Sequence, residues 1–161
     1  MTTIPVHALF EAHLVVTDLD KAIEFYRDVV GLPLAHVTPG RQSAFFWIGS
    51  ARDGMLGLWV AGGPQRMVLH TAFRTSLAQV LAAPRALRAA GITPLDFDGR
   101  PTDQPVVLAW MPAAAVYFLD PDGNLLEYIA MLQQEAHPEH GIVPWSMWEL
   151  MCSYATASVC S

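Results

Sequence analysis

Short apolar runs rich in branched residues alternate with one-sided helical segments along the chain. Residues 9–17 (LFEAHLVVT) have the composition of a strand. Asp18 can cap a helix over residues 19–30, whose apolar positions recur at helical spacing, and Gly31 can end it. Three further strands are predicted at 32–37, 42–48 and 55–60. The first part of the chain therefore predicts a strand, a helix and three strands.

The same order of elements returns after the turn-rich residues 61–64. Residues 67–74 predict a strand, and Ser76 can cap a helix that runs to residue 90. Pro84 is expected to distort or divide that helix, because proline removes one of its interior hydrogen bonds. A strand is predicted at 93–97, and two more around residue 120. The pattern predicts an internal duplication with modules at residues 1–63 and 64–131, and a C-terminal extension at 132–161.

The last predicted turn carries the most informative residue, Glu127. Asp120-Pro-Asp-Gly123 has the composition of a tight turn between two apolar strands. Glu127 is the single charged residue in the outgoing strand, residues 125–129. A carboxylate in a half-buried strand is costly unless a cation or hydrogen-bond donors meet it. The sequence therefore predicts a partner for Glu127.

Two histidines stand at equal offsets from one another and from Glu127. His13 lies in the first predicted strand, His70 lies 57 residues later (70 − 13), and Glu127 follows after another 57 (127 − 70). Alignment of MLGLWV with LLEYIA places Gly57 at the position of Glu127. Three of the four related positions thus carry groups that can bind a metal, and the fourth carries none.

Composition and charge exclude several classes of function. The chain has 161 residues, 53% of them hydrophobic, and a formal charge of −6, with no cluster of basic residues. Nucleic acid and anionic membranes are therefore not expected partners. The N-terminal residues show no signal-peptide pattern, and both cysteines, Cys152 and Cys160, fall outside zinc or disulfide spacing. A cytoplasmic protein is expected.

Taken together, these motifs resemble the vicinal oxygen chelate superfamily, which includes glyoxalase I, fosfomycin-modifying thiol transferases, extradiol dioxygenases and bleomycin-resistance proteins. The resemblance covers about residues 8–131 and rests on the order of its motifs: His13 to Asp18, Phe25-Tyr26, Gly31-Leu32, His70, and Asp120 to Glu127. It implies an α+β fold of two βαβββ modules that form a curled mixed sheet around a metal-binding cleft. It also implies the ligand set His13, His70 and Glu127, and a homodimer.

Two imidazoles and a carboxylate suit one divalent metal ion such as Zn²⁺, Ni²⁺, Mn²⁺, Co²⁺ or Fe²⁺. With Gly57 at the fourth position, coordination sites would remain for water and a small-molecule substrate. The alternative is that both histidines are core residues and that Glu127 pairs with Arg74. Residues at which a substrate could bind are Arg74, Trp59, Trp110 and Tyr117, while the other histidines lie outside the repeat.

The resemblance leaves the reaction open. The interpretation adopted is a metal-dependent lyase or isomerase of the glyoxalase I type, with Glu127 as both ligand and catalytic proton acceptor. A fosfomycin-type thiol transferase and an extradiol-type dioxygenase are alternatives, although a further active-site histidine of the dioxygenases is missing near residues 108–110. A metal-free protein that binds a drug or metabolite is the alternative of another class. Residues 144–151 could cover the cleft as a lid, dock onto a second subunit, or form a tail.

Overall fold

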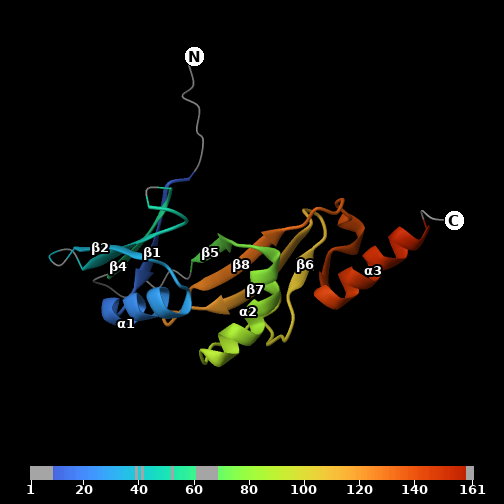
Figure 1. The fold of residues 1–161 in the computed structure, drawn as a ribbon. Helices are drawn as coiled ribbons and strands as arrows, with labels where there is room; N and C mark the ends of the chain where they lie inside the picture. Colours follow the sequence, from blue (N-terminus) through green and yellow to red (C-terminus); the bar gives the residue numbers. More distant parts are fainter. Residues whose placement is uncertain (1–8, 39, 41, 52, 61–68, 159–161) are drawn as a thin grey trace, which may run out of the picture. The chain divides into compact units, whose positions relative to one another are not determined.

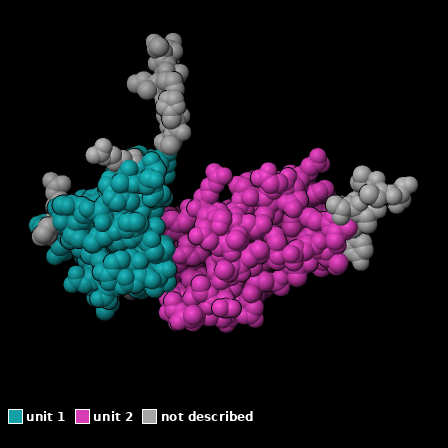
Figure 2. Space-filling view, viewed as in Figure 1, with its two compact units in different colours: residues 1–69, 120–124 teal, residues 70–119, 125–161 magenta. Residues whose placement is uncertain are grey.

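The computed structural model describes residues 9–38, 40, 42–51, 53–60 and 69–158, with side chains up to residue 153 (Figure 1). The chain divides into two compact units, which Figure 2 shows in different colours. Unit 1 comprises residues 1–69 and 120–124, and unit 2 comprises residues 70–119 and 125–161. The predicted module boundary at 63/64 and the start of the strand predicted at 67–74 lie outside the described residues.

Within the described residues, unit 1 contains a helical segment and a four-stranded sheet. The helix is followed directly by a π-helical segment, η1, and the sheet order is β1-β4-β3-β2, with β1 and β4 parallel and the other pairs antiparallel. The elements are β1 (Glu11–Val16), α1 (Leu19–Glu24), η1 (Phe25–Val29), β2 (Leu34–Thr38), β3 (Ser43–Trp47) and β4 (Met55–Val60). This is the order predicted for the first module.

Local chemistry explains where the helical segment of unit 1 begins and ends. The Asp18 carboxylate accepts a hydrogen bond from the Lys21 amide at 3.1 Å, which satisfies a free amide of the first turn. Gly31 has φ +81°, a conformation that a residue with a side chain rarely adopts. Helix and sheet pack through side chains on one sheet face, including Leu14, Leu58 and Phe46. His13 therefore lies on the other face of the sheet.

The Asp120–Asn124 turn belongs to unit 1 although it joins two strands of unit 2. Tyr26 donates a hydrogen bond from its hydroxyl to Asp120 Oδ2 at 2.8 Å, and the side-chain amide of Asn124 donates to the same oxygen at 2.8 Å. The Thr17 amide donates to Asp122 Oδ1 at 2.9 Å. Asp120 is buried, so these donors replace the water that its carboxylate has lost.

Unit 2 repeats the order of elements and adds an edge strand. Its sheet order is β5-β8-β7-β6-β9, again with the first pair parallel, and neither sheet closes into a barrel. The elements are β5 (His70–Arg74), α2 (Leu77–Ala89), β6 (Val106–Leu108), β7 (Ala113–Leu119), β8 (Leu125–Met131), η3 (Pro138–His140), β9 (Ile142–Pro144) and α3 (Trp145–Ser158). The predicted α+β class with two βαβββ modules is confirmed.

Two details of the second module differ from the prediction. Helix α2 continues through Pro84 without a division, starting from a capping box in which Ser76 and Gln79 satisfy each other's amides. Residues 93–97 form no strand: Leu95 makes isolated bridges to Pro101 and Tyr117 only. The second strand of the module is instead β6, for which the sequence analysis predicted no strand.

The two faces of the unit 2 sheet have different neighbours. One face carries Val106, Ala115 and Tyr117, with Leu125 and Ile129 packed against them, and Glu127 shares this face. On the other face, Val80 of α2 packs on Ala114 and Ala130. We refer to these as the Glu127 face and the helix face.

The C-terminal extension packs on the helix face. Strand β9 pairs with β6, Ile142 opposite Leu108 and Pro144 opposite Val106. Trp148 of α3 is 2% exposed and packs on Val107 and Ala109. Because Val107 points away from the Glu127 face, the idea that this segment forms a lid over the cleft is wrong for the described residues.

Candidate metal centre

His70 and Glu127 come together on neighbouring strands of unit 2. Strands β5 and β8 run parallel, with Ala72 opposite Glu127 and His70 opposite Leu125. The His70 Nε2 and Glu127 Oε2 atoms are 3.0 Å apart. The Glu127 side chain is 5% exposed, whereas that of His70 is 49% exposed. The partner predicted for Glu127 is therefore His70, and among the described residues no ion pair joins Glu127 to Arg74, the alternative partner.

One oxygen of Glu127 has no partner. Its Oε1 atom is buried and accepts no hydrogen bond within the described part of the chain. A buried acceptor without a donor costs about 1–3 kcal/mol, and more when it is charged. This oxygen therefore has an unused capacity to bind a proton, a cation or a donor.

The environment of Glu127 makes its carboxyl a weaker acid than a glutamate in water. Burial raises the pKa of its carboxyl above the ordinary value, while His70 and then the Tyr117 hydroxyl oppose that rise. Tyr117 lies opposite Glu127 on β7, and its ring centroid is 6.1 Å from that of His70. Burial and the neighbouring carboxylate also raise the pKa of Tyr117, so its hydroxyl is neutral at physiological pH.

His13 belongs to unit 1, where its imidazole has partners at both nitrogens. The Trp59 indole Nε1 donates to His13 Nδ1, and Glu11 Oε1 lies 3.4 Å from His13 Nε2. The ring centroids of His13 and Trp59 are 5.6 Å apart, so the two side chains are in direct contact. A ring that accepts at Nδ1 carries its proton on Nε2 when neutral. The trio of His13, His70 and Glu127 as one site stays a prediction, because its members lie in different units.

Gly57 makes room for the His13 imidazole. The two residues are paired across β1 and β4, and a Cβ atom added at Gly57 would lie 2.6 Å from His13 Nδ1. Contacts this short do not occur, so any side chain at residue 57 would displace the ring. Gly57, at the fourth related position, therefore leaves the space that the His13 ring occupies.

The pairing registers change which residues of the two modules correspond. Met55 and Leu125 begin the last strands of the two modules, and they lie opposite Glu11 and His70 respectively. By register, Glu11 corresponds to His70, and His13 corresponds to Ala72. The equal sequence offsets of His13, His70 and Glu127 concealed this correspondence. The distance to the helix cap did not resolve it either, because Ser76 follows His70 by six residues. Asp18 follows Glu11 by seven residues and His13 by five, so neither residue matches His70 in this distance. Glu11 is a candidate ligand that the sequence reasoning missed.

The remaining predicted residues of unit 2 differ in their position relative to the His70–Glu127 pair. Arg74 is exposed on β5, on the same side as His70. Trp110 is 56% exposed at the turn between β6 and β7, beyond Ala113, whereas Tyr117 is in register with Glu127. The structure therefore brings Tyr117, but not Trp110, to the His70–Glu127 pair.

An open cavity of about 540 Å³ lies at the β6–β9 edge of unit 2. Its wall includes Phe97, which is 54% exposed and has its ring centroid 6.1 Å from that of Tyr117. Val106, another wall residue, belongs to the Glu127 face. The cavity thus continues the aromatic row His70, Tyr117, Phe97 and offers space for a small organic molecule.

Comparison with known proteins agrees with this architecture. The model of the Glyoxalase/Bleomycin resistance protein/Dioxygenase superfamily matches residues 5–128, and the chain belongs to this superfamily. An integron cassette protein from the mobile metagenome of a Halifax Harbour sewage outfall is 28% identical, with a TM-score of 0.68 over 78% of this chain and 100% of the other. No curated protein matches the chain.

Two further solved structures indicate the functional range of similar folds. A lactoylglutathione lyase from Agrobacterium tumefaciens is 28% identical, with a TM-score of 0.62 over 79% of this chain and 96% of the other. The fosfomycin resistance protein FosX from Mesorhizobium loti is 19% identical, with a TM-score of 0.54 over 81% of this chain and 96% of the other, which supports the fold alone. Among the described residues, no helix has the length and apolar character needed to cross a membrane.

Proposed function

We propose that the chain is a metal-dependent lyase or isomerase of the glyoxalase I type, which acts on a small oxygenated substrate. The observation that carries this proposal is the buried, unpartnered Oε1 of Glu127 beside His70. A neutral core histidine and an ordinary buried glutamate would leave that oxygen unsatisfied, whereas a cation would satisfy it. The imidazole and carboxylate also form a donor set that borderline divalent metals accept.

His70 and Glu127 would hold the metal in unit 2, and His13 or Glu11 would complete the set from the first module. A divalent ion such as Zn²⁺, Ni²⁺, Mn²⁺, Co²⁺ or Fe²⁺, once bound, acts as a Lewis acid toward two adjacent substrate oxygens. Glu127 can accept a proton from the substrate carbon beside them. Its raised pKa brings its basicity closer to neutral pH, where a general base works best. Tyr117, neutral and adjacent, can donate a hydrogen bond to a substrate oxygen.

The similarity to a lactoylglutathione lyase supports this reaction class, and a thiol transferase or dioxygenase remains the enzymatic alternative. Arg74 would meet an anionic group of the substrate, and Trp59 would hold His13. Trp110 stays a weaker prediction for substrate binding. A homodimer in the cytoplasm is the expected form of the protein.

A second candidate function is a metal-free binding protein. His13 favours it, because Trp59 and Glu11 engage both of its ring nitrogens as they would in a core histidine. The cavity of about 540 Å³ would then hold the drug or metabolite.

Metal content separates the two functions. Tag-free protein purified without chelator should hold a divalent ion that His70→Ala and Glu127→Gln both remove, while His36→Ala, which changes a histidine of β2 outside the proposed ligand set, keeps it. Comparison of Glu11→Gln with His13→Ala then identifies the ligand from the first module. The metal-loaded protein should be screened with hemithioacetals of α-keto aldehydes, with epoxides plus thiols, and with catechols. Protein that takes up no ion at the His70–Glu127 pair would refute the enzyme proposal and favour ligand binding.

A further inference from the structure

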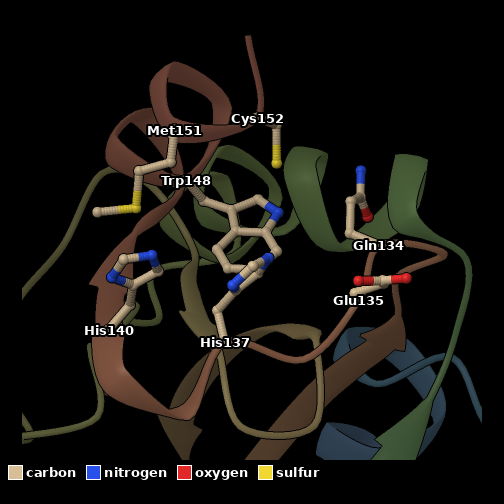
Figure 3. A pocket seen from close by; sticks show the side chains of 7 residues that line it. All are labelled: Gln134, Glu135, His137, His140, Trp148, Met151 and Cys152. Carbon is tan, nitrogen blue, oxygen red and sulfur yellow. The ribbon is translucent and has the colours of Figure 1, made fainter. Parts of the chain in front are cut away.

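A second cavity, of about 370 Å³, lies in the C-terminal extension (Figure 3). Its lining side chains come from the loop after β8, from η3 and from α3: Gln134, Glu135, His137, His140, Trp148, Met151 and Cys152. Trp148 packs on the helix face of the sheet, so the cavity lies away from the Glu127 face. Any ligand bound here would be separate from the site proposed above.

His140 is the last residue of the 3₁₀ turn η3, and His137, three residues earlier, is the N-cap residue of that turn. Side chains at i and i+3 lie above one another in a 3₁₀ turn, and these two ring centroids are 5.5 Å apart with planes at 33°. The backbone is held in place: Pro138 fixes φ at the start of the turn, and the His137 amide donates to the Ala109 carbonyl at 2.9 Å. The two imidazoles are therefore presented together by a constrained loop.

Glu139 completes a cluster of three metal-binding groups. Its Oε1 atom is 3.0 Å from His137 Nδ1 and 3.9 Å from His140 Nε2, and one donor atom from each residue lies within 4.8 Å of the others. Ligands about 2.0–2.2 Å from a tetrahedral zinc ion are roughly 3.2–3.6 Å apart, so small side-chain rotations would suffice. A backbone hydrogen bond and then His137 hold the pKa of Glu139 below its ordinary value, so the carboxylate is ionised at neutral pH.

Trp148 supplies an independent sign of a missing ligand. Its indole Nε1 is buried, and within the described residues it has no hydrogen-bond partner, although it belongs to the lining of this cavity. Its ring lies 6.1 Å from that of His137 at 62°. Figure 3 shows His137 against the Trp148 indole, with His140 on the side away from Gln134 and Glu135. Figure 3 shows the indole nitrogen on the side of Cys152 and Gln134, so an oxygen ligand that extends from the bound ion across the cavity would supply the acceptor that this buried N–H requires.

We propose that His137, Glu139 and His140 form a second binding site, which takes a divalent transition metal such as Zn²⁺, Ni²⁺ or Cu²⁺. The metal keeps at least one coordination position for an exogenous oxygen ligand, and the Trp148 N–H donates to that ligand inside the cavity. Imidazole and carboxylate donors select these ions over Mg²⁺ and Ca²⁺, which prefer oxygen ligands alone.

The test uses tag-free full-length protein carrying His70→Ala and Glu127→Gln, so that only the second site can respond. Calorimetric titration with Zn²⁺ at pH 7.5 should show one equivalent bound. Substitution of His137 or His140 by alanine, or Glu139→Gln, should each weaken binding by about tenfold or more, because each removes one of three ligands. Matched controls are His36→Ala and Glu149→Gln, which remove the same groups elsewhere and should leave the affinity unchanged.

Absence of Zn²⁺ binding in this background, or binding that survives both histidine substitutions, would overturn the proposal. Circular dichroism of each variant confirms that the fold is retained, which is expected because the imidazoles of His137 and His140 are 46% and 35% exposed. Failure of this site leaves the proposed enzymatic function untouched, since the two sites share no residue.

The part assigned to Trp148 has its own test. Malonate, a small dicarboxylate, should bind the zinc-loaded protein, and Trp148→Phe should weaken malonate binding by about tenfold while leaving Zn²⁺ affinity unchanged. Phenylalanine keeps most of the buried ring and removes the N–H. Equal malonate affinity in the two proteins would refute the hydrogen bond.

Discussion

Substitution of Glu127 by glutamine should stabilise the protein when metal is withheld and destabilise it when metal is present. The carboxylate is 5% exposed, its Oε2 atom is paired with His70, and its Oε1 atom has no partner. Glutamine keeps the shape and the contact with His70 but removes the buried charge.

The magnitude follows from the unpaired oxygen. A buried charged acceptor without a hydrogen bond destabilises the folded protein by about 1–3 kcal/mol. The uncharged amide of glutamine removes most of this cost, but its own unpaired polar atom keeps a part of it. We therefore expect a net gain of about 1–2 kcal/mol in the free energy of unfolding, or about 2–8 °C in Tm for a chain of this size. With metal at 100 times its Kd, the wild-type protein instead gains about 2.7 kcal/mol, and the order of stability reverses.

The pH dependence has a defined sign. Because burial raises the pKa of Glu127 in the folded protein, its stabilising contribution is complete below the ordinary value of 4.5 and is lost as pH rises through the raised value. The advantage of Glu127→Gln should therefore be absent in acid and grow above pH 4.5. Urea unfolding in EDTA at several pH values, and again with Zn²⁺, measures it. A variant that is less stable in EDTA at every pH would refute the unpaired charge.

Three further substitutions test the packing. Gly57→Ala should cost about 1–3 kcal/mol by displacing the His13 ring, measured by urea unfolding, whereas Gly40→Ala, where nothing lies within 4 Å, should be neutral. Tyr26→Phe should cost about 1.5–3 kcal/mol in the same assay, because it removes a hydrogen bond to the buried Asp120 carboxylate. Trp148→Ala should cost about 3–5 kcal/mol by leaving a cavity over Val107, and a Tm within 2 °C of the wild-type value would contradict that packing.

Much of the fold follows from local signals in the sequence. Asp18 and Ser76 start the two helices because their side chains accept hydrogen bonds from the first turn, and this chemistry is visible in the sequence. Strand β6 was missed because all three of its residues are buried, so it lacks the alternation that identifies a strand with one face in water. The role of β9 was also missed, since three residues carry too little pattern to predict their pairing with β6.

The site was predictable only where spacing and register agree. The offset of 57 residues correctly led to the contact of His70 with Glu127. The same offset pointed to His13 rather than Glu11, although His13 stands two residues beyond the position that the pairing registers match with His70. Such a difference is invisible until the hydrogen-bonded pairs of β1 and β4 are known.

The pairing of β9 with β6 makes the two repeats differ at one edge of their sheets. In unit 1 the corresponding strand, β2, is an edge strand that pairs only with β3 among the described residues. A register shift between Leu34 and His36 interrupts that pairing. In unit 2, β9 occupies the free backbone groups of β6. An uncovered strand invites pairing with another chain, so the extension protects one repeat from aggregation, while the other relies on its irregular backbone.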